Sequence, residues 1–184
     1  MANSIFIPRQ IGAMDVAIWN RHAIASGSAM GDIDNGSVFN LPTKSTKVDE
    51  FEVWEATLSG STIAGQLWMA YSGEYFSPEL QPSFSADDAK AFTNKNGKVF
   101  PAFMPQVGDL ITVSAGVLKT PFATGDTHVV PVAEELKMDW VDADPGTGLT
   151  YKLIQTIPLS FGAIGLNNTG HQETGYILEC IRAS

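Results

Sequence analysis

The chain has almost no cysteine, which limits how it can be held together. Cys180 is the only cysteine among 184 residues, so no disulfide can form within the chain. Its neighbours Ile177, Leu178 and Ile181 are apolar, which predicts a buried thiol in a final strand. Stability must therefore come from packing, and a chain that is 44% hydrophobic at this length can bury a sizeable core.

Charge is also scarce, and positive charge most of all. Charged residues make up 17% of the chain, against about 25% in an average globular protein. Eleven Lys and Arg residues against 20 Asp and Glu give a net charge of -9. No basic cluster is long enough to follow a phosphate backbone, so we expect no nucleic-acid partner.

Long apolar runs are missing too. No stretch reaches the roughly 18 apolar residues that would predict a membrane span. Residues 1–10 lack the basic start and the long apolar run of a secretory signal peptide. These absences predict a protein that is made in the cytoplasm and has no membrane partner.

The common catalytic and metal-binding motifs are absent from the sequence. The nearest match to a nucleophile elbow begins with Pro158, where the motif needs glycine for its strained turn. The histidines have no second His or Cys at metal-ligand spacing; they are His22, His128 and His171. We expect a protein that is not an enzyme and that has no cofactor and no metal site.

Two acidic groups need a separate interpretation. Asp139, Asp142 and Asp144 precede Gly146 as in a calcium loop, but Leu153 stands where an EF-hand requires a bidentate glutamate. We interpret this group as an acidic turn. A glycosidase pair would need two carboxylates facing one cleft, and for the second group we favour a solvated charged face; it comprises Glu50, Glu52 and Glu55.

What the chain has instead is a series of short apolar and aromatic runs separated by Gly, Pro, Asn and Ser. Residues of this kind at roughly ten-residue spacing predict strands, here at 37–41, 50–58, 63–71, 98–104, 110–113, 127–132, 149–157 and 175–182. Short helical segments are expected at 85–92 and 134–140. The pattern predicts an all-β fold, an antiparallel β-sandwich or β-barrel with an extended N-terminal arm and one or two short helices.

Several strands carry particular signals. Asn35 and Gly36 tolerate the positive φ of a tight turn before the first strand. The segment 63–71 has apolar residues on both faces, which predicts a strand covered on both sides, and we favour the core for Trp54 and Trp68. Pro101 predicts that 98–104 is an edge or interrupted strand.

Residues 1–30 are predicted to be an arm, and residues 31–184 the β domain. Pro8 and Gly12 interrupt the apolar pattern, and residues 26–28 read Ser-Gly-Ser. The segment holds two basic residues and one acidic residue, a local charge of +1. This charge either lets the arm approach an acidic surface or is too small to matter. The predicted protein-contacting residues are Phe6, Ile7, Arg9, Ile11, Trp19 and Arg21 in the arm, with Tyr75 and Phe76 in the irregular loop 72–84.

Four segments resemble a known group of proteins in strand pattern and order. They are Asn35-Gly-Ser-Val-Phe-Asn-Leu41, Asp49-Glu-Phe-Glu-Val-Trp54, Leu67-Trp-Met-Ala-Tyr-Ser72, and Phe92-Thr-Asn-Lys-Asn-Gly-Lys-Val-Phe100 continuing through Pro105-Gln-Val-Gly-Asp-Leu-Ile-Thr112. The chain is similar there to the head decoration, or cement, proteins of tailed bacteriophages. The resemblance covers about a third of the chain.

The resemblance implies a non-enzymatic protein on the capsid surface of a virion. Such a protein binds the assembled capsid lattice and stabilises it by bridging neighbouring subunits. Its partners would be the major capsid protein and neighbouring copies of the chain itself. Two alternatives stay open: a carbohydrate- or receptor-binding β module of a phage tail or surface, with Tyr75 and Phe76 as its aromatic platform, and an enzyme whose site is assembled from distant residues.

Overall fold

The computed structural model describes residues 4–12, 20–25, 30–46, 52–60, 65–72, 93–161 and 171–183. These residues are nearly all β-structure, which confirms the predicted fold class. Each of the eight expected strand segments contains a strand. No helix within the described ranges has the length and apolar character needed to cross a membrane.

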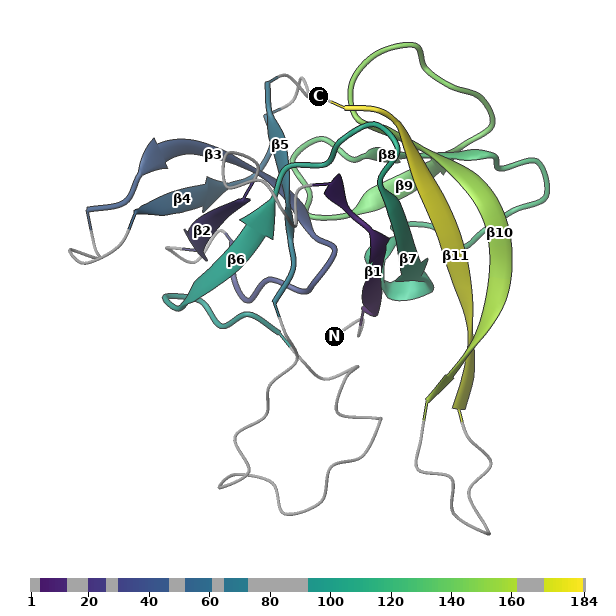
Figure 1. Ribbon diagram of the computed structural model, residues 1–184, viewed down its shortest axis with the longest axis horizontal. Helices are drawn as coiled ribbons and strands as arrows, with labels where there is room; N and C mark the ends of the chain where they lie inside the picture. Colours follow the sequence, from purple (N-terminus) through teal and green to yellow (C-terminus); the bar gives the residue numbers. More distant parts are fainter. Residues whose placement is uncertain are drawn as a thin grey trace, which may run out of the picture.

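One sheet has six strands, and all of its neighbouring strands are antiparallel. Their order is β1 (Phe6–Gln10), β7 (Leu110–Ser114), β11 (His171–Arg182), β10 (Thr150–Phe161), β8 (His128–Pro131) and β9 (Met138–Val141). The β10–β11 hairpin is much longer than its neighbours and extends past the end of β7 (Figure 1).

The second sheet closes into a barrel. Its strands follow the order β2 (Asn20–Ala25), β4 (Val53–Thr57), β3 (Val38–Lys44), β5 (Leu67–Ala70) and β6 (Val99–Phe103), and β6 pairs again with β2. Only the β2–β4 pair is parallel among these strands. The barrel lies beside the six-stranded sheet (Figure 1).

Strands β3 and β5 form a wall that both hydrophobic cores share. Val38, Leu67 and Met69 face the core between the barrel and the six-stranded sheet. The alternate residues Phe39 and Trp68 face the barrel interior. Because both faces of this wall are covered at β5, that strand is apolar along its whole length. The predicted burial of 63–71 on both sides is confirmed for 67–70, whereas Gly65 and Gln66 are exposed.

The predicted arm is wrong for its described residues. Strand β1 pairs with β7 at the edge of the six-stranded sheet, and β2 lies within the barrel. Phe6 and Ile11 are only 3% and 7% exposed and belong to the core of their own chain. Pro8 and Gly12 do interrupt the apolar pattern, but a short edge strand tolerates a proline, so the interruption does not separate this segment from the sheets.

Two further expectations are wrong, and one lies outside the described residues. The predicted helical turn at 134–140 is wrong at its end, because Met138 begins β9. The helix expected at 85–92 lies outside the described residues. Strand β6 is not an edge strand: it pairs with both β2 and β5. Pro101 fits there because its carbonyl accepts a bond from Tyr71 N at 3.1 Å, so its missing N–H also faces Tyr71, just past the end of β5, and costs no bond to β2.

The predicted Asn35–Gly36 turn is present. Gly36 has a φ of 84°, a conformation that side chains disfavour. A Cβ at this position would also lie 3.1 Å from side-chain atoms of Phe6 and Val117. Glycine is therefore required here both by backbone conformation and by the close approach of the six-stranded sheet.

Candidate binding surfaces

The first candidate surface is the outer face of the six-stranded sheet, the side of β1, β7, β10 and β11 that points away from the core. Side chains alternate along each strand, and Phe6, Val113 and Leu178 point into the core. Their neighbours face outward. The apolar residues of this outer face include Ile7, Leu110, Ile154, Ile157, Leu159, Ile177 and Ile181, of which Leu159 and Ile177 are buried at 7% and 9% exposure.

The register of the strands brings these residues together. Ile7 pairs with Thr112, and Thr112 pairs in turn with Ile177. On β10 the register shifts between Leu153 and Gln155, which leaves Ile154 as the extra residue of a bulge with half of its side-chain surface exposed. An antiparallel sheet with one covered face usually presents polar residues on the other, so this apolar character is unusual.

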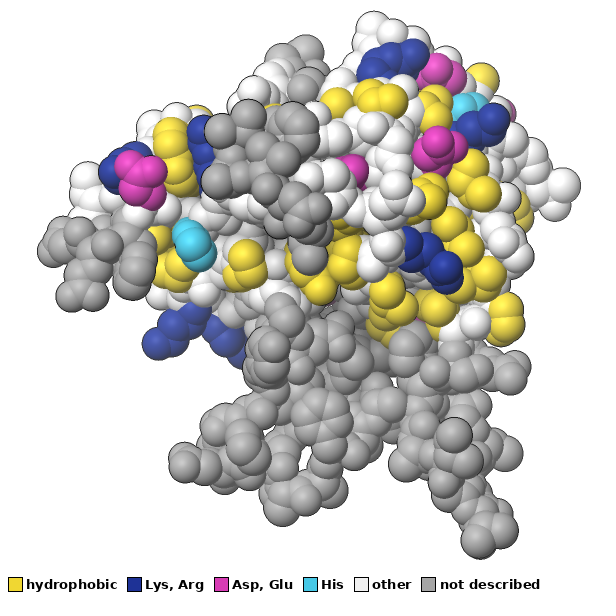
Figure 2. Space-filling view, viewed as in Figure 1, with side chains coloured by type: hydrophobic (Ala, Val, Ile, Leu, Met, Phe, Trp, Pro, Cys, Tyr) yellow, Lys and Arg dark blue, Asp and Glu magenta, His cyan; other side chains and the backbone are white. Residues whose placement is uncertain are grey.

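Few charges accompany the apolar residues. Arg9 and Lys152 are exposed on the outer face, and Glu173 and Glu179 are half-buried there. Arg9 lies over the sheet and donates from Nε to Oγ1 of Thr112 at 2.5 Å. Figure 2 shows yellow side chains over the region where β7, β10 and β11 lie in Figure 1, with basic side chains among them. The surface is apolar, and its two basic and two acidic residues balance, on a chain that is acidic overall.

Both open edges beside this face carry a proline in the position where it blocks strand addition. On β1, the carbonyl of Ile5 accepts from Ser114 N at 2.9 Å, so alternation turns the main chain of Ile7 toward β7 and that of Pro8 toward the free edge. Without an N–H, Pro8 cannot donate to an added strand.

The same alternation holds on β10. Cys180 N donates to Asp109 O at 2.8 Å, which turns Cys180 away from β10. Because the main-chain groups of successive residues alternate in direction, those of Gly175 and Glu173 point toward β10, where these residues pair with Ile157 and Leu159. Pro158, between those two partners, therefore faces the open edge.

The second candidate surface lies at one end of the barrel, where Arg21 contacts two tryptophans. The Cζ atom of Arg21 is 3.8 Å from the ring centroid of Trp54 and 4.7 Å from that of Trp68. Arg21 and Trp54 are half-buried, whereas Trp68 is buried. Both distances are within the range of a cation–π contact. Trp68 also lines a cavity of about 370 Å³ together with Asn40, Leu41 and Gln66.

The predicted contact residues thus fall into four groups. Ile7 and Arg9 share the outer face of the six-stranded sheet. Arg21 lies apart from them, at the barrel. Phe6 and Ile11 are core residues, so the expectation that they contact another protein is wrong. Three of the predicted residues lie outside the described ranges; they are Trp19, Tyr75 and Phe76.

Sequence reasoning missed most of the outer face. Leu110, Ile154, Ile177 and Ile181 were not predicted to make contacts. A signal was present in 175–182, where Ile177 and Ile181 are apolar although they alternate with the core residues Leu178 and Cys180. Apolar residues on both faces of a strand indicate a second covered face.

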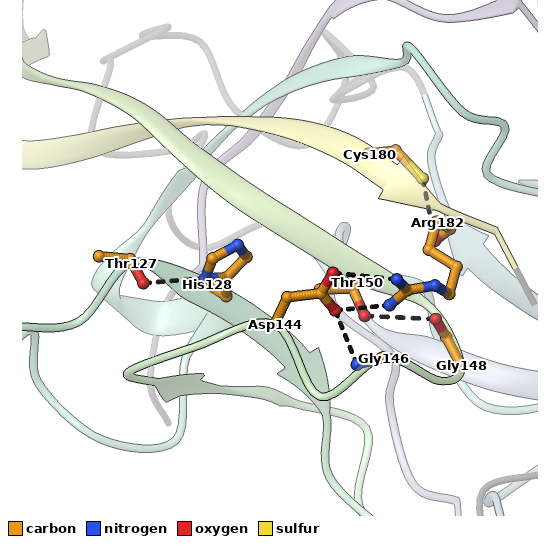
Figure 3. Close-up of polar contacts among 8 residues, drawn as sticks. All are labelled: Thr127, His128, Asp144, Gly146, Gly148, Thr150, Cys180 and Arg182. Carbon is orange, nitrogen blue, oxygen red and sulfur yellow. Dashed lines mark hydrogen bonds and ion pairs between the residues drawn. The ribbon is translucent and has the colours of Figure 1, made fainter.

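The acidic turn before β10 is occupied by the chain's own donors (Figure 3). Arg182 NH1 and NH2 donate to the two oxygens of Asp144 at 2.5 and 2.9 Å, and Gly146 N donates to Asp144 at 2.9 Å. Chiefly because of the bond from Arg182, and next that from Gly146, the pKa of Asp144 falls to about 2. This ion pair joins the end of β11 to the turn.

The calcium-like spacing of the acidic turn does not produce a cation site. Asp139 accepts from the Thr120 hydroxyl and from Trp140 N, away from Asp144. Among the described residues no group of three or more His, Cys, Asp or Glu side chains is placed to hold a metal ion. Glu52 forms an exposed ion pair with Lys44 at 3.0 Å, as expected of a solvated charged face.

Cys180 is buried, as predicted from its neighbours. Burial raises the pKa of its thiol to about 12, so the thiolate is negligible at neutral pH. Burial likewise raises the pKa of Tyr151, which pairs with Cys180 across the β10–β11 ladder, well above its usual value. These two groups are core residues and present no nucleophile.

Comparisons of the chain with protein-family models, with curated proteins and with solved structures find no match.

Proposed function

We propose that the chain is a non-enzymatic structural protein of a virion, a head decoration protein that binds the assembled capsid lattice and stabilises it by bridging neighbouring subunits. The observation that carries the proposal is the apolar outer face of the six-stranded sheet. Ile7 and Ile154 are 40% and 50% exposed on a face that would otherwise be solvated. A contiguous apolar surface on a folded chain is typical of a protein-binding site.

The open edges favour docking through side chains. Pro8 and Pro158 interrupt the outward-facing hydrogen-bond groups of β1 and β10, so a partner cannot extend the sheet with an uninterrupted strand. The partner must instead lie on the outer face and bury the isoleucines. Such a contact can be specific without covering an edge.

The partner itself is inferred from the resemblance to phage decoration proteins. A capsid lattice presents many identical sites, so each copy needs only a modest affinity if neighbouring copies also touch one another. The few charges of the outer face balance, so this side would dock with the least charge repulsion, because the remainder of the chain carries the excess negative charge.

The proposal is tested with shells of the major capsid protein of the proposed virion, purified without this chain, and with the two variants Ile154→Glu and Val99→Glu. The two side chains are similarly exposed, at 50% and 42%, but Val99 lies on the barrel. We expect wild type and Val99→Glu to cosediment with the shells. Ile154→Glu should bind at least about tenfold more weakly, because it buries a charge in the contact.

Two outcomes would contradict the proposal at different points. If both variants bind the shells normally, the outer face is not the docking surface. If the folded wild-type protein does not bind the shells at all, the capsid role itself is wrong. If the wild-type protein binds, cryo-electron microscopy of the decorated shells would show which face of the chain contacts the lattice.

A further inference from the structure

The three arginines of the chain differ in what holds them. Arg9 donates to Thr112, and Arg182 forms two bonds with Asp144. Arg21 contacts two indole rings, but within the described part of the chain no carboxylate or other acceptor bonds its guanidinium. Among the described residues, it is therefore the arginine that is held by rings and has no acidic partner.

The position of Arg21 follows from the strand. It alternates with Ala23 and Ala25, which line the barrel interior, so its side chain is on the interior face. Because β2 begins at Asn20, Arg21 lies at the mouth of the barrel and not in its middle. The rings of Trp54 and Trp68 hold the guanidinium there, which fixes the direction of its N–H donors.

The acidic residues of the adjacent strand are engaged elsewhere. Strand β4 runs beside β2, and the acidic residues at its start and middle are Glu52 and Glu55. Glu52 pairs with Lys44 at 3.0 Å, and Glu55 accepts from the Ser45 hydroxyl at 3.4 Å. The chain thus places carboxylates near the barrel mouth without directing either of them to Arg21.

We propose that Arg21, held by Trp54 and Trp68 at the barrel mouth, is a binding site for a carboxylate. A planar guanidinium fixed by stacking matches the two oxygens of a carboxylate, which accept two parallel N–H bonds. The half-buried setting strengthens such a pair relative to one in open water. The carboxylate comes either from an acidic side chain of another protein or from a small free acid. The site is independent of the outer face and of the capsid role.

The test follows the three arginine Nε–H signals by NMR in the full chain labelled with 15N-arginine. Sodium acetate is added against sodium chloride at matched ionic strength. We expect the Arg21 signal to shift and saturate with acetate only. The Arg9 and Arg182 signals serve as internal controls and should move little, because both side chains already have partners.

Two peptides then identify the source of the carboxylate. Acetyl-Gly-Glu-Gly-amide should shift the Arg21 signal, and the matched Gln peptide should not. Saturation by the Glu peptide at a lower concentration than acetate supports a protein side chain as the ligand. Saturation by acetate at an equal or lower concentration supports a small free acid.

Variants separate the guanidinium from simple positive charge. Arg21→Lys, followed through tryptophan fluorescence, should weaken binding at least about fivefold, because an ammonium cannot form the paired bonds. Trp54→Phe should bind more tightly than Trp54→Leu, since it keeps an aromatic face. The proposal is overturned if the Arg21 shift does not saturate, if all three arginine signals shift alike, or if inorganic phosphate saturates the site at a lower concentration than acetate.

Discussion

The barrel gives each of its strands a neighbour on both sides, whereas among the described residues of the six-stranded sheet β1, β9 and most of β10 have no strand partner along one edge. Closure through the β2–β4 and β2–β6 pairs removes the edges of the barrel. The open sheet instead carries Pro8 and Pro158 at its edges. The difference indicates that the sheet presents side chains on its outer face while prolines interrupt its open edges, whereas the barrel has no open edge.

The two interiors differ as well. Among the described residues, five of the eleven buried members of the barrel core are alanine, whereas the eighteen of the other core include none. A small barrel has a narrow interior, so large residues such as Phe39 and Trp68 must alternate with small ones. The wider space under the curved sheet takes larger side chains throughout. In the barrel, the narrow interior thus limits the size of the side chains. In the sheet, the clearest constraint is on the residues at the open edges.

Deleting the N-terminal strands should have the largest effect on stability, because β1 belongs to the open sheet and β2 to the closed barrel. Removing residues 1–12 takes away one edge strand, and we expect a cooperative but less stable fold, because Phe6 and Ile11 leave the core. Removing residues 1–28 also takes away β2 and opens the barrel, so we expect no cooperative unfolding transition in urea. A cooperative transition in the chain that begins at residue 29 would show that β2 is dispensable.

The β10–β11 hairpin offers the next largest effect. A Cβ on Gly175 would lie 2.6 to 3.0 Å from three side-chain atoms of Leu159, closer than packing allows. Gly175→Ala should therefore lower the free energy of unfolding by about 1–3 kcal/mol. The same change in a Leu159→Ala background should cost less, because the obstructing side chain is gone. Additive costs in urea unfolding would contradict the direct contact.

Restoring donors at the sheet edges should change association more than stability. Pro8→Thr with Pro158→Thr returns an N–H to each open edge, and we expect concentration-dependent self-association in sedimentation velocity. Pro101→Thr is the matched control, since Pro101 lies in the closed barrel. If the control associates to the same extent, loss of proline acts through something other than the open edges.

The smallest effect should come from the Asp144–Arg182 pair at the exposed acidic turn. Because the pKa of Asp144 is lowered to about 2, its ordinary value being 3.8, the carboxylate favours the folded state above pH 3.8. That contribution is lost as the pH falls from 3.8 through about 2. Relative to the intrinsic exchange rate at each pH, the protection of the Gly146 amide against hydrogen exchange should fall over this interval. In Asp144→Asn this protection should not change with pH over the same interval. A wild-type profile identical to that of the variant would contradict the assignment.

Local sequence patterns were enough to predict the all-β class, most strands, the Asn35–Gly36 turn and the burial of Cys180. Each depends on near neighbours: alternation identifies a strand, and glycine supplies the positive φ of a turn. A pattern of this range also argued against an EF-hand at the acidic turn, because Leu153 stands at the position of the closing ligand.

The features that the sequence did not predict depend on pairing between residues far apart in the chain. Whether Phe6 and Ile11 lie on another protein or in their own core depends on β7, about a hundred residues away, and no local pattern contains that partner. The outer face appears only when Ile7, Thr112 and Ile177 meet across three strands. Arg21 likewise meets Trp54 and Trp68 because the barrel closes around them. Side-chain alternation specifies two faces for every strand, but the choice between core and surface is made by whatever the fold packs against each face.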